Sequence, residues 1–308
     1  MTKKIVVATK KPFHPVAVQK IKEACDKKGY EFKLFEKYNT QEELMDAIKD
    51  ANGIIIRSDK ITEEVINNCQ NLEVVVRGGA GYDNVDCDAA KKKNVVVMNT
   101  PGQNSNAVAE LAFGMMVFMA RNKYNGKPGT ELKEKTIGIH AYGNVGQNVA
   151  RIAKGFGMKV IAFDPFVSSE AIKADGVKPL ESVEELYSNA DYISVHIPSI
   201  PQTQKFIGKT LINSMKKNAA IINTARKEVI NDEELIEVFS KREDLLFASD
   251  IAPVIKDEMI EKFGDRVFFT PKKMGAQTAE ANINAGVAGI NQIIALFDED
   301  DRTFQVNK

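Results

Sequence analysis

A short turn near the middle of the chain has the residue types and spacing that bind a dinucleotide. The apolar run KTIGIH is followed by Ala141, Tyr142, Gly143, Asn144, Val145 and Gly146, and a helix is predicted to start there. This is the G-x-G-x-x-G pattern with alanine in the first glycine place. The second glycine lets the backbone approach a pyrophosphate, and the third allows close packing of helix on strand. The helix start presents free N–H groups to phosphate oxygens.

An acidic residue stands where a ribose-binding carboxylate is expected. Asp164 ends the next apolar run, KVIAFD, 18 residues beyond Gly146, and Pro165 follows it. A carboxylate there accepts hydrogen bonds from ribose hydroxyls and repels a 2′-phosphate, so the pattern favours NAD over NADP. The alternative is an ordinary strand-to-helix turn with Asp164 as a cap. That alternative does not account for the strand, the glycines, the helix and the acid occurring together.

The elements that must position these residues follow a regular order. Short apolar runs alternate with amphipathic helical stretches, which is typical of βαβ units and parallel sheets covered on both faces. The sequence therefore predicts an α/β fold of two Rossmann-like, doubly wound parallel-sheet domains. The expected strands are KIVVAT, EFKLFE, GIIIRS, LEVVVRG, NVVVMN, KTIGIHA, KVIAFD, YISVHIP, AAIINTA, LLFASDI and VFFT. The expected helices include residues 15–28, 41–51, 104–121, 182–189, 231–241 and 278–297.

Composition limits the kinds of partner. Lys+Arg and Asp+Glu balance at 42 each, which argues against nucleic acid or a membrane surface as a partner bound through bulk charge. The 3 cysteines form no C-x-x-C pair, so neither a disulfide framework nor a metal site is expected, and a reducing compartment fits best. The N-terminus starts with a charged strand and not with a signal sequence, so we expect a cytoplasmic protein.

Several segments together resemble one known family over nearly the whole chain. They are RGGAGYDNVD (77–86), VVMNTPGQNSNAVAE (96–110), SVHIP (194–198), INTARKEVIND (222–232) and TPKKMGAQTAEA (270–281). With the dinucleotide pattern, they are similar to the D-2-hydroxyacid dehydrogenases, and in particular to the short phosphoglycerate dehydrogenases that have no serine-binding regulatory domain. The resemblance implies an NAD-binding domain at residues 103–273, a substrate domain at residues 1–102 plus 274–308, and a cleft between them.

The resemblance also assigns catalytic roles, with two departures from the family pattern. Arg226 matches the catalytic arginine of the family's N-x-x-R motif, where its guanidinium would hold the substrate carboxylate and polarise the C–O bond. The family's catalytic histidine is absent, and register from the Gly275-Ala276 side places Lys273 there. The glutamate that the family pairs with this histidine falls at about Ile255. Asp250 keeps the position of a carboxylate that approaches the nicotinamide amide.

The two departures are mutually consistent. A lysine must be neutral to accept a proton, and a neighbouring glutamate would hold it protonated. Loss of that glutamate, with Arg226 and the oxidised nicotinamide nearby, favours the neutral amine. We therefore expect Lys273 to be the acid/base. The alternatives are a non-catalytic protein that only binds NAD, and a solvated pair of lysines in a loop.

The remaining site residues come from the same resemblance. The other expected NAD contacts are His196, Ile197, Pro198, Thr224, Ala225, Gly275 and Ala276. The expected substrate contacts are Arg57, Ser58, Lys60, Gly79, Ala80 and Gly81, besides Arg226. The backbone of the glycine loop would bind the carboxylate, and Arg57 with Lys60 the distal phosphate. Plain surface ion pairs remain the alternative for the phosphate residues.

These assignments imply a particular reaction. The expected function is NAD-dependent oxidation of D-3-phosphoglycerate to 3-phosphohydroxypyruvate, the first step of phosphorylated serine biosynthesis. The alternatives are a glyoxylate or hydroxypyruvate reductase, which would not need Arg57 and Lys60, and a corepressor-like scaffold that binds NAD without turnover. The apolar helix at residues 104–121 resembles the family's dimer-forming element, so a homodimer is expected. Packing of this helix within one chain is the alternative.

Overall fold

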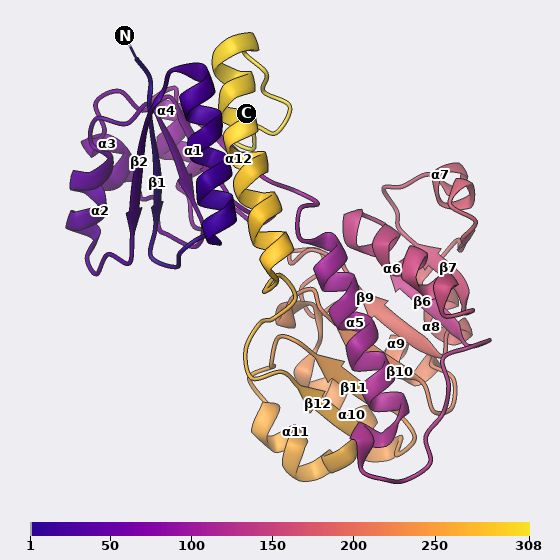
Figure 1. Cartoon of the computed structure of the whole chain (residues 1–308). Helices are drawn as coiled ribbons and strands as arrows, with labels where there is room; N and C mark the ends of the chain where they lie inside the picture. The colour runs from indigo at the N-terminus through magenta and orange to yellow at the C-terminus, as the bar shows by residue number, and fades with distance from the viewer. Residues whose placement is uncertain (1) are drawn as a thin grey trace. The chain divides into compact units, whose positions relative to one another are not determined.

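The computed structural model describes residues 2–308 and divides into two compact units. The first unit comprises Met1–Asn104 and Thr278–Lys308, and the second is Ser105–Gln277. Each unit contains one sheet whose strands all pair in parallel, with helices on both faces (Figure 1). The predicted α/β architecture of two doubly wound sheets is therefore confirmed. The expected boundaries at residues 102 and 273 lie just before these divisions.

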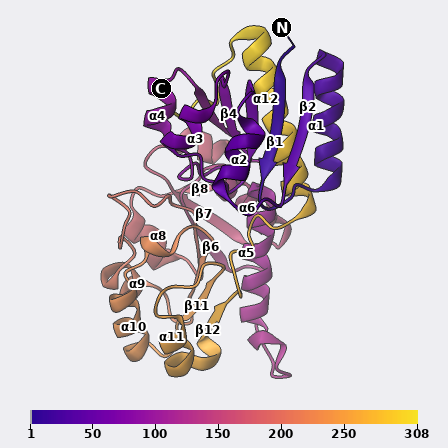
Figure 2. The same ribbon diagram turned by 90° about the vertical axis from the view of Figure 1, so that its left-hand side faces the viewer.

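The first unit holds a five-stranded sheet in the order β2-β1-β3-β4-β5. Its strands are β1 (Lys4–Thr9), β2 (Glu31–Glu36), β3 (Gly53–Ile56), β4 (Val74–Arg77) and β5 (Val96–Asn99). Its helices are α1 (Pro15–Lys28), α2 (Gln41–Ile48), α3 (Glu63–Asn68), α4 (Cys87–Lys92) and α12 (Ala279–Glu299). Helices α1 and α12 lie side by side on one face, and α2, α3 and α4 cover the other (Figures 1 and 2).

Alternation of apolar side chains explains why this sheet is covered on both faces. In β1, Ile5 and Val7 pack toward α1 and α12, whereas Val6 and Ala8 pack toward α2 and its neighbours. All four side chains are fully buried. A strand with apolar residues on both sides requires a helix layer on each face, which is the arrangement of a doubly wound sheet.

The second unit holds a seven-stranded sheet in the order β12-β11-β10-β9-β6-β7-β8. Its strands are β6 (Thr136–His140), β7 (Lys159–Phe163), β8 (Lys178–Pro179), β9 (Tyr192–Val195), β10 (Ala220–Asn223), β11 (Leu246–Ser249) and β12 (Val267–Phe269). Its α-helices are α5 (Ser105–Ala120), α6 (Asn144–Gly155), α7 (Ser169–Ala174), α8 (Val183–Asn189), α9 (Lys209–Ser214), α10 (Asp232–Lys241) and α11 (Lys256–Phe263). Single 3₁₀ turns occur at η1 (Asn122–Tyr124), η2 (Lys227–Val229) and η3 (Gly264–Arg266).

The strand order of this sheet determines where a ligand is expected to bind. The chain builds outward from β6 through β7 to β8, then returns to β9 on the other side of β6 and continues to β12. In sheets of this kind, ligands bind beyond the carboxyl ends of the strands, at the point where the direction of winding reverses. That point lies between β6 and β9.

Helix α5 packs inside its own unit. The buried side chains of Met115, Met116 and Met119 belong to the core that also contains α6 and residues of β6 and β10. The structure therefore accounts for most of the apolar surface of α5 without a second subunit, and the homodimer stays a prediction. Among residues 2–308, no helix is both long enough and apolar enough to span a membrane.

Candidate functional site

The glycine turn lies at the carboxyl end of β6 and leads directly into α6. Gly143 is the N-cap of α6, and no side chain caps this helix end. A Cβ on Gly143 would meet no other atom within 4 Å, whereas a Cβ on Gly146 would come within 2.4 Å of the Ala141 carbonyl oxygen. Gly143 therefore leaves space above an open helix start, and Gly146 allows α6 to approach the turn. Both features fit a bound pyrophosphate.

Asp164 lies at the end of β7, beside this turn. One carboxylate oxygen accepts a hydrogen bond from the backbone N–H of Tyr142 at 2.7 Å, and the other accepts one from the N–H of Phe166 at 2.8 Å. The carboxylate is therefore held in place and is only partly buried. Pro165 is exposed next to it. A carboxylate oxygen can accept more than one hydrogen bond, so both oxygens can still accept hydrogen bonds from ribose hydroxyls.

The other expected polar residues follow β10, β11 and β12, the strands on the opposite side of β6. Because every pairing in this sheet is parallel, the carboxyl ends of β6, β7, β9, β10, β11 and β12 share one edge. The expected cofactor contacts and the expected acid/base group thus lie along the same edge of the second unit.

Arg226 lies in a loop that is shaped by a buried asparagine. The Asn223 amide donates to the Arg226 carbonyl oxygen at 2.9 Å, and its side-chain oxygen accepts from the Ala225 N–H at 3.0 Å. The Arg226 guanidinium donates to the Ala225 carbonyl oxygen at 2.8 Å. Thr224 and Ala225 are buried in the same turn. A guanidinium has five N–H donors, so the remaining donors can bind a carboxylate.

Asp250 connects the end of β11 to the loop that carries Lys273. It is fully buried, and one carboxylate oxygen accepts the Gly275 N–H at 2.8 Å. Thr270 fixes the start of the same loop, because its hydroxyl lies 3.1 Å from the Asp250 carbonyl oxygen and 2.7 Å from that of Lys272. Burial raises the pKa of Asp250, while the Gly275 N–H and the positive charges of Lys273 and Arg226 oppose this rise.

Lys273 has an acidic neighbour although the family's glutamate is absent. Ile255, at the place of the family's glutamate, is the N-cap of α11 and packs against the core. Whether another carboxylate lies near Lys273 could not be predicted from the sequence. Asp250 interacts electrostatically with Lys273. An ionised Asp250 favours the protonated form of the Lys273 amine.

His196 follows β9 at the same edge, and its surroundings keep it neutral. Its Nε2 lies 2.8 Å from the Ser194 hydroxyl. Burial, with a smaller contribution from the charge of His140, lowers the pKa of His196 to about 3. Ile197 is buried and Pro198 is exposed. A neutral imidazole here fits a wall of the nucleotide site better than a proton-transfer group.

The first unit holds the expected substrate residues at the carboxyl ends of β3 and β4. The Arg57 guanidinium donates to the carbonyl oxygens of Lys11 and Pro12, at 3.2 and 2.8 Å, and lies 5.5 Å from the centre of the Phe13 ring. Ser58 and Lys60 are exposed beside it. Desolvation lowers the pKa of Arg57, but an arginine still remains charged at neutral pH. This guanidinium is therefore oriented before any ligand binds.

The glycine loop after β4 has an unusual backbone. Gly79 has a φ of 143°, and a Cβ there would come within 1.7 Å of the Arg77 guanidinium. The carbonyl oxygens of Gly79 and Ala80 accept hydrogen bonds from the Thr100 N–H and the Asn99 amide. Gly81 continues the loop and is partly buried. The positive φ favours glycine at position 79, and the Arg77 guanidinium lies close against this part of the loop.

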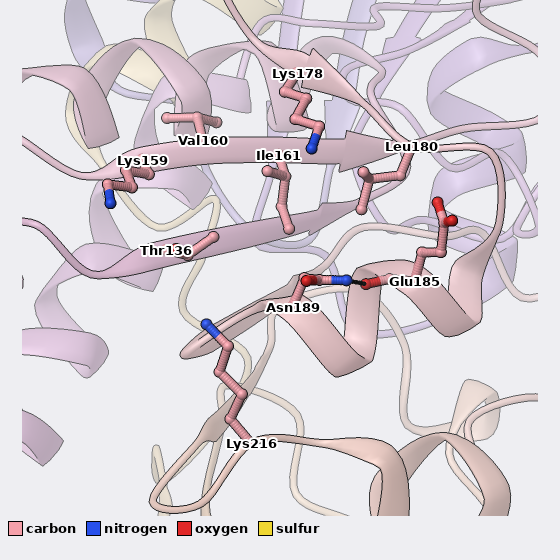
Figure 3. A pocket seen from close by; sticks show the side chains of 9 residues that line it. All are labelled: Thr136, Lys159, Val160, Ile161, Lys178, Leu180, Glu185, Asn189 and Lys216. Carbon is pink, nitrogen blue, oxygen red and sulfur yellow. Dashed lines mark hydrogen bonds between the residues drawn. The ribbon is translucent and has the colours of Figure 1, made fainter.

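Two surface hollows do not coincide with the NAD and acid/base residues of the second unit. The larger, of about 440 Å³, lies near the amino ends of β6 and β7 and is lined partly by Lys159, Lys178 and Lys216 (Figure 3). It is at the opposite edge of the sheet from the glycine turn. The smaller, of about 300 Å³, lies in the first unit beside Ser58 and Lys60.

Sequence reasoning missed three residues that shape the site. Thr270 pins the Lys273 loop, Asp175 accepts a hydrogen bond from the Tyr142 hydroxyl at 3.0 Å, and Phe166 is 91% exposed beside Asp164. The contact of Thr270 with Asp250 joins residues 20 positions apart, and that of Asp175 with Tyr142 joins residues 33 apart, so no local pattern reveals these two contacts. Phe166 could have been singled out as a large apolar residue directly after a predicted ribose-binding aspartate.

Comparison with known proteins agrees with this geometry. Residues 114–271 match the family described as D-isomer specific 2-hydroxyacid dehydrogenase, NAD binding domain. The chain belongs to the D-isomer specific 2-hydroxyacid dehydrogenases, and its second unit is the NAD-binding domain of that family.

Individual relatives lie within the same family. The chain is 45% identical to the NAD⁺-bound crystal structure of 3-phosphoglycerate dehydrogenase from Entamoeba histolytica, with a TM-score of 0.88 over 100% of this chain and 99% of that one. It is 37% identical to D-3-phosphoglycerate dehydrogenase of Methanocaldococcus jannaschii over 82% of this chain, but spans only 51% of that protein. It is 34% identical to hydroxypyruvate reductase of Thermotoga maritima over 85% of this chain and 90% of that one.

Proposed function

We propose that the protein oxidises D-3-phosphoglycerate to 3-phosphohydroxypyruvate with NAD, as in the first step of phosphorylated serine biosynthesis. The observation that carries this proposal is the shared edge of the second sheet. The open start of α6 and Asp164 lie at the same edge as Arg226, Asp250 and the Lys273 loop. A cofactor cradle and a cationic acid/base group are the two parts that hydride transfer from a 2-hydroxy acid requires.

The proposed roles follow from the chemistry of each side chain. Arg226 binds the substrate carboxylate through the guanidinium donors that its own loop does not use. Lys273 accepts the proton of the C2 hydroxyl as the C–H bond breaks, and the C–O bond becomes a carbonyl. NAD⁺, which the open start of α6 and Asp164 would hold, would supply the hydride acceptor for C2. Arg57 binds the distal phosphate, and the backbone N–H groups of the loop at residues 79–81 assist with the carboxylate.

Asp250 affects the proposed proton transfer in two ways. Its hydrogen bond to Gly275 holds the Lys273 loop, and its negative charge favours the protonated lysine. Oxidation needs the neutral amine, whereas reduction needs the ammonium. We therefore expect oxidation of the hydroxy acid to increase toward alkaline pH and reduction of the keto acid to be favoured toward neutral pH.

The experiment is to measure NADH formation from D-3-phosphoglycerate with the parent protein, Lys273→Met and Lys272→Met, from neutral to alkaline pH. Lys272 is the matched control because it is the neighbouring lysine in the same loop and both side chains are exposed. Lys273→Met is expected to lower kcat by about 10²-fold or more while NADH binding persists. Equal turnover of all three proteins would rule out Lys273 as the base. Absence of turnover in the parent, with intact NADH binding, would favour the non-catalytic scaffold.

A hydroxypyruvate reductase is the second candidate, because the Thermotoga maritima relative bears that name and matches the chain over most of its length. The two functions differ in their need for a phosphate contact. Arg57→Ala is expected to raise KM for the phosphorylated substrate by about 10- to 100-fold and to change KM for hydroxypyruvate little. Equal losses with both substrates would contradict the phosphate role of Arg57 and favour the reductase.

A further inference from the structure

The glycine turn contains a backbone conformation that its sequence disfavours. Ala141 occupies the first glycine place of the pattern and has a φ of 81°, in the left-handed region. A residue with a Cβ is strained there, whereas glycine is not. The Ala141 N–H donates to the Phe163 carbonyl oxygen at 2.9 Å, and its own carbonyl oxygen lies against Gly146 at the start of α6. The packing of the turn therefore requires this conformation at Ala141.

Tyr142, the next residue, is anchored in the core. Its side chain is 1% exposed and packs in the core that contains Val149 of α6 and Ile172 of α7. Its hydroxyl donates to the Asp175 carboxylate, just beyond the end of α7. Burial first, and then the hydrogen bond to Asp175, raises the pKa of this phenol, so the hydroxyl keeps its proton. The side chain therefore lies in the core and is not exposed for contact with a ligand.

The backbone of Tyr142 serves the cofactor site directly. Its N–H orients the Asp164 carboxylate at 2.7 Å, and its carbonyl oxygen accepts from the Gln147 amide at 3.3 Å. Gly143, the N-cap of α6, follows it. A movement of Tyr142 would therefore displace both the ribose-binding carboxylate and the open helix start.

We propose that Tyr142 is a positioning residue for NAD: its hydroxyl bond to Asp175 holds the turn in the conformation that binds the cofactor and that Ala141 disfavours. This inference rests on the cofactor site of the proposed function but not on its substrate or on Lys273. Without the hydroxyl bond, Ala141 relaxes toward an unstrained conformation, and only part of the population keeps the turn that binds NAD. The apparent affinity for NAD is then the intrinsic affinity multiplied by the fraction of molecules that keep this turn. With glycine at position 141 the turn is not strained, so loss of the hydroxyl bond does not change its conformation.

The test is a double-mutant cycle read out by NADH binding. The dissociation constant is measured by fluorescence titration for the parent, Tyr142→Phe, Ala141→Gly and the double variant. Tyr142→Phe is expected to raise the dissociation constant about tenfold in the parent but less than about twofold beside Ala141→Gly. Asp175→Asn keeps an acceptor for the hydroxyl and is expected to bind nearly as the parent does. Because turnover is not measured, failure of the proposed reaction does not affect this result.

Tyr192→Phe is the matched control, since Tyr192 is also a buried tyrosine of the second unit but lies at the start of β9, the opposite end of the strands. It is expected to leave NADH affinity unchanged. Thermal unfolding of every variant separates loss of fold from loss of affinity. An equal effect of Tyr142→Phe with alanine or glycine at position 141 would overturn the proposal, as would unchanged affinity of Tyr142→Phe in the parent.

Discussion

Ionisable side chains are buried at or near the carboxyl edge of the second sheet, where the environment controls their charge. His140 ends β6, is 4% exposed, and its Nδ1 lies 3.2 Å from the Tyr187 hydroxyl. Burial lowers the pKa of His140 to about 4, although the charge of Asp164 opposes this. The neutral ring next to the glycine turn adds no positive charge of its own. Phosphate binding there is therefore expected to depend on the start of α6.

The buried histidine predicts a pH dependence of stability. The folded-state pKa of His140 is about 4, below its ordinary value of 6.5. Between these values the unfolded chain binds a proton that the folded protein does not, so the free energy of unfolding decreases as the pH falls through this window. One such group contributes a slope of about 1.4 kcal/mol per pH unit. His140→Asn is expected to reduce the slope by about that amount in urea titrations near pH 5.

The control for His140→Asn is a variant that keeps His140 and removes the hydroxyl of Tyr187. Tyr187→Phe takes away the contact at Nδ1 but leaves the buried ring. We expect this variant to be less stable than the parent at every pH and to keep the parent's slope. An unchanged slope in His140→Asn would show that another group is responsible.

At the scale of the elements, side-chain caps determine where several helices begin. Thr40, Ser182 and Asn231 each accept a hydrogen bond from the N–H three residues later, at the starts of α2, α8 and α10. In each case a glutamate stands three positions after the cap residue, which is a local pattern typical of helix starts. No side chain caps the start of α6, and the same is true of α9 and α11. The one helix start assigned to the cofactor is therefore left open for a ligand.

The cap of the last helix gives a prediction about the first unit. The Thr278 hydroxyl accepts the Ala281 N–H at 3.1 Å at the start of α12. Thr278→Ala is expected to lower the free energy of unfolding by about 1 kcal/mol, while Thr278→Ser retains most of it. Urea unfolding followed by circular dichroism measures both. Equal stability of the parent and the alanine variant would show that the cap contributes nothing.

Some features could not be predicted from sequence, for identifiable physical reasons. All strands except β8 were expected, and β8 has only two residues, too few to show a pattern. The glycine turn and Asp164 were recognisable because their residues lie in one βαβ unit. The contact between Asp250 and Gly275 joins residues 25 positions apart, and that between Tyr142 and Asp175 joins residues 33 apart. Such contacts depend on how neighbouring loops fold together, which spacing alone does not specify.

At the scale of the whole molecule, the two units differ in whether one continuous segment of the chain forms them. The second unit is one uninterrupted segment, Ser105–Gln277, and its sheet is covered by its own helices on both faces. The first unit is assembled from two segments. Whether the protein is a homodimer and whether it is cytoplasmic stay predictions, which sedimentation and cell fractionation can check.

Continuity predicts that the second unit folds by itself. A fragment of residues 105–277 is expected to unfold cooperatively and to be stabilised by NADH, by about 2.7 kcal/mol when the ligand is at 100 times its dissociation constant. Thermal unfolding with and without NADH measures this. A fragment that lacks a cooperative transition would show that the cofactor domain needs the first unit.

The packing of α12 beside α1 has a consequence for synthesis on the ribosome. All five strands of the first sheet are translated before α12, whose side chains complete the cover over Ile5, Val7 and Val74. During the time needed to translate the second unit, part of this apolar face has no partner. Nascent chains at this stage should therefore be clients of hydrophobic-binding chaperones, and release from them should coincide with the emergence of residues 279–299.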